Sequence, residues 1–211
     1  MQLEANNKTK NFFENSFHHV QISDERRSLL QRIADNILEL RQQSNSTMYL
    51  NFICTHNSRR SQFAQVWSFF AAYYFDLQWI KSYSGGTSVT AFYKNTLKAL
   101  QEAGFHFKLE EFNHQNPKYS IEFGVSNESL LGFSKRYDDA MNSNPFIAIT
   151  TCGSADENCP FIPTALSRFH VPYEDPKAMD HTDNASDAYL NTSKQIAAEI
   201  YFLFQHLKAN L

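Results

Sequence analysis

The sequence predicts an α/β protein, a three-layer sandwich with a central parallel sheet. Two observations support this prediction. Short apolar segments that are typical of buried strands alternate with longer segments of helical periodicity. Two of these strands run directly into a cysteine, at Cys54 and at Cys152. Because ligands bind at the carboxyl ends of the strands in such sheets, we expect both thiols to face one crevice.

Residues 1–47 are expected to form an N-terminal helical extension and a linker. Residues 1–22 form a polar lead-in with no clear periodicity, for which no element is assigned. Ser23, followed by two acidic residues, is typical of a helix start, and apolar residues then recur at helical spacing up to Arg41. Residues 42–47 have the polar composition of a linker. The main domain is expected to span residues 48–211.

The main domain is expected to begin with a strand at 49–53 and a helix from Ser61. Its remaining elements are a strand at 79–83, a helix at 91–103 that ends at Gly104, strands at 146–151 and 168–171, and an amphipathic helix at 186–207. Segments 119–123 and 129–133 flank a turn region at 124–127 and predict a hairpin.

Composition excludes several classes of protein. The chain has 211 residues and a formal net charge of −3, which gives no electrostatic basis for binding nucleic acid or an anionic membrane. No apolar run approaches membrane length, and the first residues lack a secretory core. Three cysteines are an odd count, which argues against a disulfide scaffold. We therefore expect a cytoplasmic protein whose cysteines are either buried or catalytic.

Segment 54–61, Cys-Thr-His-Asn-Ser-Arg-Arg-Ser, is the candidate active site. A cysteine, five residues and an arginine between a strand and a helix can wrap around a tetrahedral oxyanion, with backbone N–H groups pointing at it. Arg60 would grip two oxygens of the anion, and the positive field favours the Cys54 thiolate as a nucleophile. The loop residues expected around the anion are Thr55, His56, Asn57, Ser58, Arg59 and Ser61.

Individual side chains of this loop have alternative interpretations. Asn57 and Ser58 can brace the loop through local hydrogen bonds, and Ser61 can donate to the thiolate. Arg59 either faces solvent or attracts the anion. His56 either donates to the anion or has a structural role.

Segment 49–67 resembles the phosphate loop of low-molecular-weight protein tyrosine phosphatases and of the thioredoxin-coupled arsenate reductases that share their fold. Segment 82–86, Ser-Tyr-Ser-Gly-Gly, resembles the turn after the second strand of that family. Asp175 and Pro176 resemble the Asp-Pro pair that carries the general acid. The resemblance extends from about residue 49 to residue 207 and implies a low-molecular-weight phosphatase-like fold.

Segment 150–160, which contains Cys152 and Cys159, resembles the redox segment of the arsenate reductases. The resemblance implies a relay in which Cys54 attacks arsenate, Cys152 attacks Cys54, and Cys159 attacks Cys152. Asp175 would protonate the departing hydroxyl, and thioredoxin would reduce the final disulfide. The spacing of Cys152 and Cys159 does not match a zinc knuckle.

Two departures from the family pattern bear on the substrate. Lys177 and Ala178 stand where the phosphatases have a pair of tyrosines that line the phosphotyrosine slot, unless Tyr173 and Tyr93 replace them. Gln65 stands where potassium-binding members have a glutamate. We therefore expect no metal and no other cofactor.

Three functions fit these residues. The first is a thioredoxin-coupled arsenate reductase that uses the three cysteines. The second is a phosphatase that hydrolyses phosphate monoesters through a cysteinyl-phosphate, with the extra cysteines guarding Cys54. The third is a module that binds oxyanions or senses redox state without catalysis. The presence of Asp175 argues against the third, because a sensor needs no general acid.

Overall fold

A four-stranded parallel sheet forms the centre of the protein, in a computed structural model that describes residues 7–124, 128–158 and 161–211. Its strands lie in the order β2 (Ile80–Gly86), β1 (Met48–Cys54), β6 (Phe146–Thr150) and β7 (Ala165–His170). The helices are α1 (Asn7–His19), α2 (Asp24–Ser44), α3 (Arg60–Tyr74), α4 (Lys94–Glu102), α5 (Gly153–Asn158) and α6 (Ala185–Ala209). The predicted α/β class with a parallel sheet is confirmed.

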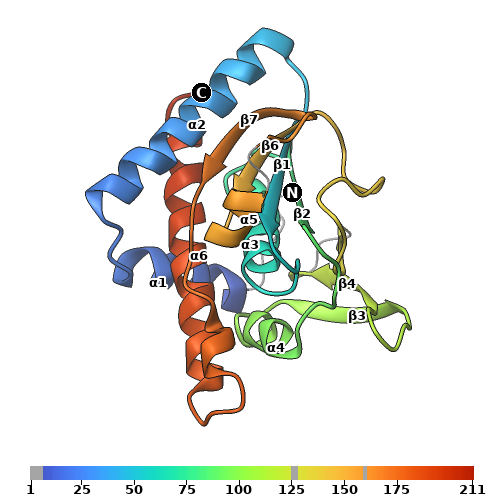
Figure 1. Cartoon of the computed structure of the whole chain (residues 1–211). Helices are drawn as coiled ribbons and strands as arrows, with labels where there is room; N and C mark the ends of the chain where they lie inside the picture. The colour runs from blue at the N-terminus through green and yellow to red at the C-terminus, as the bar shows by residue number, and fades with distance from the viewer. Residues whose placement is uncertain (1–6, 125–127, 159–160) are drawn as a thin grey trace.

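Helices pack around the central sheet (Figure 1). The two faces of the sheet carry separate hydrophobic clusters. Successive side chains of a strand point to opposite faces, so Leu50 and Phe52 of β1 join the larger cluster and Ile53 joins the smaller one. Helices α1, α2, α3 and α6 supply the larger cluster, and Ala155 of α5 lies in the smaller. The sheet is therefore the middle one of three layers, as predicted.

Helix α6 is the helix against which most of the other helices pack. It contacts α1, α2, α3 and α4, and it also contacts the one-turn 3-10 helix η1 (Pro176–Met179). No helix in the described part of the chain combines the length and apolar character that a membrane span requires.

Helix α1 forms within the polar lead-in at residues 1–22, where the sequence indicated no particular element. Phe13 is completely buried, and its ring stacks on Trp67 at a centroid distance of 5.5 Å and meets the edge of Phe70 at 5.2 Å. Helical stability in proteins comes mostly from tertiary packing rather than from propensity. The few aromatic residues of α1 are enough because their partners lie on α3 and α6, which are distant in the sequence.

We expect Phe13→Ala to lower the free energy of unfolding by about 3–5 kcal/mol, because the substitution leaves a cavity in a packed aromatic cluster. Urea denaturation of the full chain measures this. Phe112→Ala is the matched control, because Phe112 is 67% exposed and its loss should change stability by less than about 0.5 kcal/mol. Equal effects of the two substitutions would show that α1 does not contribute to the core.

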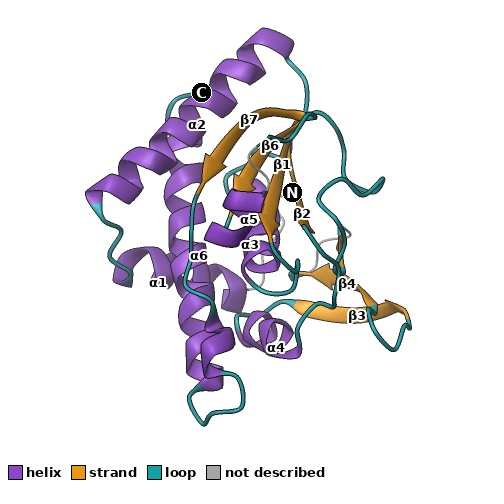
Figure 2. Ribbon diagram, in the orientation of Figure 1, coloured by secondary structure: helices purple, strands orange, loops and turns teal. Residues whose placement is uncertain are grey.

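A small antiparallel sheet, β3 (His106–Glu111), β4 (Lys118–Glu122) and β5 (Leu130–Gly132), lies beside α4 (Figure 2). The predicted hairpin corresponds to β4 and β5, and part of its predicted turn, 125–127, lies outside the described residues. Strand β3 was not predicted. Its apolar residues Phe107 and Leu109 alternate with polar ones, a pattern that the sequence-based prediction overlooked, and the strand pairs with β4.

Helix α4 begins at Lys94, three residues later than predicted. The preceding residues contact the candidate site instead of continuing the helix. The carbonyl of Ala91 accepts a hydrogen bond from Ser58 Oγ at 2.7 Å, and the N–H of Tyr93 donates to the carbonyl of Ser58 at 3.1 Å. These contacts fix the start of α4 against the loop.

Candidate active site

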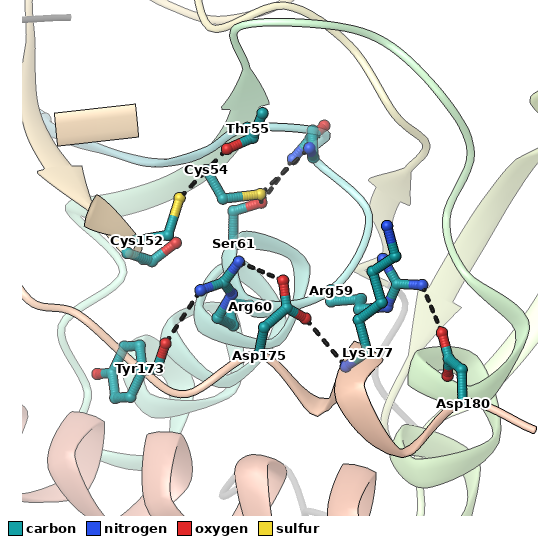
Figure 3. A network of polar contacts seen from close by, with 12 residues as sticks. Cys54, Thr55, Arg59, Arg60, Ser61, Cys152, Tyr173, Asp175, Lys177 and Asp180 are labelled. Atoms are coloured by element: carbon teal, nitrogen blue, oxygen red, sulfur yellow. Dashed lines mark hydrogen bonds and ion pairs between the residues drawn. The ribbon is translucent and has the colours of Figure 1, made fainter. Parts of the chain in front are cut away.

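Loop 54–60 joins the carboxyl end of β1 to the first residue of α3 (Figure 3). The Sγ atom of Cys54 lies 3.0 Å from Ser61 Oγ and accepts a hydrogen bond from the backbone N–H of Asn57 at 3.1 Å. N–H groups in the first turn of a helix lack intrahelical partners and favour an anion. The loop therefore surrounds a buried thiol with donors that can stabilise a thiolate or an oxyanion.

Asn57 and Ser58 brace the loop as predicted. Asn57 has a left-handed backbone (φ 46°), and its side chain donates to Ser61 Oγ at 2.9 Å while its Oδ1 accepts from the N–H of Lys135 at 2.9 Å. Gln62 also holds the loop by donating to the carbonyl of Asn57 at 3.0 Å. The loop is thus tied to α3 on one side and to segment 133–137 on the other.

Gly86, at the end of β2, lies in close contact with the backbone of the loop. A Cβ atom at this position would lie 2.8 Å from the carbonyl oxygen of Thr55 and 2.9 Å from the N–H nitrogen of Asn57. Real Cβ atoms do not approach backbone this closely, so a larger residue would push the loop outward. This contact is the physical reason for glycine in the turn at 82–86.

Arg60 and Asp175 form an ion pair beside loop 54–60. We call this loop, with its N–H groups around the Cys54 thiol, the cradle. Arg60 donates to Asp175 Oδ2 at 2.5 Å and to the carbonyl of Tyr173 at 3.0 Å. The Nε atom of Arg60 is buried and has no hydrogen-bond partner among the described residues. Asp175 Oδ1 also accepts from the N–H of Lys177 and caps η1. The arginine and the proposed general acid thus meet at the same place, with one arginine donor still available.

Arg59 does not face solvent, so that interpretation of its side chain is wrong, and its role in attracting the anion stays a prediction. It donates to Tyr189 Oη and to Asp180 Oδ2 at 2.9 Å, and it lies 4.1 Å from the ring centroid of Tyr93. Burial alone would lower the pKa of Arg59, but Tyr189 and Asp180 outweigh it and the pKa is raised. Burial likewise opposes ionisation of Asp180, yet Tyr189 and Arg59 lower the pKa of its carboxyl.

Cys152 lies beside the cradle at the carboxyl end of β6. Its Sγ is 3.5 Å from Thr55 Oγ1, and the preceding Thr151 donates its N–H to the carbonyl of Ile53 at 2.7 Å. Both Cys54 and Cys152 are free, buried members of the smaller hydrophobic cluster. The two neighbouring parallel strands thus bring these thiols to the same edge of the sheet. Cys159 lies outside the described residues.

Helix α5, which follows Cys152, is held to the sheet by Asp156. Asp156 Oδ1 accepts from Thr150 Oγ1 at 2.8 Å, lies 3.3 Å from His170 Nδ1, and pairs with Arg168. A segment anchored by these contacts has a defined position beside Cys152. No pattern in the sequence predicted this cluster, because its members belong to three different elements.

The remaining predicted positions lie as follows. The side chain of His56 is exposed, and its carbonyl accepts from Ser134 Oγ at 2.9 Å, so its contribution to the loop is through the backbone. Gln65 is buried and bonds Ser84 Oγ at 2.5 Å and the carbonyl of Ser82 at 3.4 Å. The side chain of Gln65 thus belongs to a hydrogen-bond network of uncharged groups.

Neither tyrosine considered as an aromatic wall is available for that role. Tyr173 is buried in the main core, with Arg26 at 5.4 Å from its ring centroid. The guanidinium of Arg59 lies over the ring of Tyr93. The Tyr93 ring is also stacked on the ring of Tyr189, with 5.7 Å between the ring centroids. The segment after Asp175 therefore has no replacement for the missing aromatic pair in these two residues.

Four residues at the site were missed from the sequence: Gln62, Lys135, Asp180 and Tyr189. Burial lowers the pKa of Lys135 to about 8, against an opposing effect of Asp139. Asp180 left no sequence signal, because its partner Arg59 lies 121 residues away in the chain. The other three look like ordinary helix or loop residues until the chain folds.

The fold and the site together define an α/β protein with a cysteine-arginine oxyanion loop at the carboxyl end of a parallel sheet. No protein-family model matches the sequence. The chain is 29% identical over 138 residues to an arsenate reductase of Bacillus subtilis strain 168, which covers 65% of this chain and 81% of the relative. An arsenate reductase of Bacillus licheniformis is 28% identical over 146 residues, covering 69% and 85%.

Two solved structures align with most of the chain. A thioredoxin-dependent arsenate reductase of Corynebacterium glutamicum is 16% identical with a TM-score of 0.45, covering 97% of this chain and 86% of that one. A low-molecular-weight phosphotyrosine phosphatase of Vibrio cholerae is 16% identical with a TM-score of 0.48, covering 75% and 95%. The sequence relatives confirm the resemblance to the arsenate reductases that loop 54–60 indicated.

Proposed function

We propose that the protein is an arsenate reductase that uses Cys54, Cys152 and Cys159 in turn. The observation that carries this proposal is the second free thiol, Cys152, buried beside the oxyanion loop and in contact with Thr55 at 3.5 Å. A thiol at that place can attack the Cys54 adduct and lead to its reduction, in competition with hydrolysis of the adduct by water. The similarity to arsenate reductases over two thirds of the chain supports the same conclusion.

In the first step the Cys54 thiolate attacks arsenic and forms an S–As bond, and a hydroxyl leaves. Arg60 and the loop N–H groups hold the arsenate oxygens, and the spare Nε of Arg60 supplies one of the donors. Asp175 protonates the departing hydroxyl, which leaves as water.

In the second step the Cys152 thiolate attacks the Sγ of Cys54. The S–As bond breaks, its electron pair reduces As(V) to As(III), and arsenite leaves as the Cys54–Cys152 disulfide forms. Cys159 then attacks Cys152, which releases the Cys54 thiolate and forms a Cys152–Cys159 disulfide. This step requires α5 to rearrange, because a helix separates the two cysteines.

The Cys152–Cys159 disulfide must be reduced before the next turnover. A thioredoxin-type dithiol is the proposed reductant, and it supplies the two electrons and two protons that the cycle consumes. Each cycle begins with three reduced thiols, so we expect the enzyme to work in the reducing environment of the cytoplasm.

Hydrolysis of phosphate monoesters is the alternative function, because phosphate and arsenate share shape and charge. The same Cys54, Arg60 and Asp175 would form and hydrolyse a cysteinyl-phosphate. The absence of an aromatic pair at Lys177 and Ala178, with Tyr93 covered by Arg59, weighs against a phosphotyrosine slot. A non-catalytic redox sensor remains the second alternative, and it leaves Asp175 without a role.

We expect reduced protein mixed with arsenate to yield a Cys152–Cys159 disulfide, detected by peptide mass spectrometry after acid quenching. Omitting arsenate should leave all three thiols reduced on the same time scale. Cys152→Ser should abolish thioredoxin-coupled turnover, because no thiol then resolves the Cys54 adduct.

The alternatives give different results in the same experiment. A phosphatase would hydrolyse an aryl phosphate equally well with Cys152→Ser and would form no disulfide with arsenate. A sensor would turn over neither substrate and would form a disulfide with peroxide. Full arsenate turnover by Cys152→Ser would contradict the relay.

A further inference from the structure

Arg59 joins the oxyanion loop to the segment that carries the general acid. Its guanidinium donates from one nitrogen to Tyr189 Oη on α6 and from another to Asp180 Oδ2, and it lies on the ring of Tyr93 at 4.1 Å. Asp180 completes the cluster by accepting from Tyr189 Oη at 2.8 Å. The Arg59 and Asp180 side chains are 12% and 9% exposed, so solvent screens this ion pair only weakly.

Asp180 and Asp175 belong to the same short segment. Asp175 is the N-cap of η1 and Asp180 is its C-cap, with the N–H of Asp180 donating to the carbonyl of Lys177 at 3.0 Å. Two adjacent arginines of the loop therefore hold the two ends of one helical turn (Figure 3). Arg60 holds the Asp175 end, and Arg59 holds the Asp180 end.

These two ion pairs differ in what an oxyanion does to them. Arg60 starts α3 at the end of the cradle, so a bound oxyanion competes with Asp175 for its guanidinium. The donors of Arg59 are directed away from the cradle, toward Tyr189 and Asp180, and the anion leaves them in place. If Arg60 alone held the segment that carries Asp175, a bound oxyanion would release that segment at the step in which Asp175 has to donate its proton.

We propose that Arg59 and Asp180 are positioning residues: their ion pair keeps the Asp175 segment at the cradle while Arg60 exchanges Asp175 for the bound oxyanion. This inference rests on the proposed oxyanion chemistry of Cys54 and Arg60. It assigns the second arginine of the loop a role other than anion binding. Tyr93 and Tyr189 fix the plane of the Arg59 guanidinium and so set the place of Asp180.

Asp180→Asn should lower kcat for arsenate by about 10–100-fold, because small misplacement of a catalytic group has effects of that size. The KM for arsenate should stay within about threefold of the wild-type value, because Arg60 and the loop N–H groups still bind the anion. Asp180→Glu should restore part of kcat, because it keeps the charge. Glu111→Gln, which removes an exposed ion pair with Lys118, should match the wild type.

A second experiment needs no substrate and tests the two attachments directly. Hydrogen exchange of the backbone in segment 174–180 is measured by mass spectrometry for Asp175→Asn, Asp180→Asn and the double variant. The exchange rate of each single variant should lie within about threefold of the wild-type rate, because the one remaining ion pair still closes the segment. The double variant should exchange at least about tenfold faster than the wild type.

The two experiments separate the failure of this inference from the failure of the proposed function. A wild type that does not reduce arsenate contradicts the proposed function, and the exchange experiment still decides the role of Arg59. A double variant that exchanges no faster than Asp175→Asn overturns the inference. Wild-type kcat in Asp180→Asn overturns it as well, whereas a rise in KM at unchanged kcat would assign the pair to anion binding.

Discussion

Cys54→Ser is expected to abolish arsenate reduction, with turnover below about 10⁻⁴ of the wild type, because the loss of a covalent nucleophile has effects of that order. A serine hydroxyl is not ionised near neutral pH, and an As–O–Ser adduct offers no sulfur for Cys152 to attack. Neither the attack on arsenic nor the transfer of electrons to it can occur. The measurement is thioredoxin-coupled arsenate turnover, followed as consumption of the reductant.

Binding separates this loss of chemistry from a loss of structure. The cradle of Cys54→Ser keeps Arg60 and the N–H groups of the loop, so we expect inorganic phosphate to raise its melting temperature by as much as that of the wild type. Cys152→Ser is the matched control, since it should bind phosphate equally well and still form the Cys54 adduct. Turnover by Cys54→Ser above about one per cent would contradict the assignment of the nucleophile, because covalent catalysts lose far more than that.

Arg60→Lys is expected to lower kcat/KM for arsenate by about 10²–10³-fold, the range found when one donor to a developing oxyanion is lost. Arg60 offers a planar fork that contacts Asp175 and Tyr173 and keeps Nε unpaired for the anion. A lysine ammonium keeps the charge but not the fork, so it cannot make two parallel hydrogen bonds to the oxyanion. Steady-state kinetics over a range of arsenate concentrations measures the effect.

Arg41→Lys is the matched control for this substitution. Arg41 lies in the last turn of α2, where it contacts the carbonyl of Ser46 and the ring of Trp79, far from the carboxyl ends of the strands. Its replacement should leave kcat/KM within about twofold, as is usual for a surface substitution. If Arg60→Lys behaved like Arg41→Lys, positive charge alone would suffice at the cradle.

Local patterns predicted most of the elements because those elements are determined locally. The helix after Ser23 formed as expected, with Ser23 accepting from the N–H of Arg26 and Asn45 ending it in a left-handed conformation. The apolar segments before Cys54 and Cys152 became neighbouring parallel strands. Caps, periodicity and apolar runs act over a few residues, so a sequence displays them directly.

The elements that were missed depend on partners elsewhere in the chain. Helix α1 has few apolar residues, and it is stable because Phe13 enters a cluster built by α3 and α6. Strand β3 has mostly exposed side chains and pairs with β4. For α1, tertiary contact outweighs local preference, which a reading of local patterns cannot detect.

The sequence by itself determined the cradle. Cys54, the five residues after it and Arg60 are contiguous, and the strand and helix on either side place them in one loop, which is the basis of the proposed oxyanion site. Only the tertiary structure decided the partners of the two arginines. Arg60 meets Asp175 across 115 residues, and Arg59 meets Asp180 across 121. Hydrogen bonds and ion pairs act over a few ångströms, so contacts between residues so far apart in the chain exist only once the sheet brings its strand ends together.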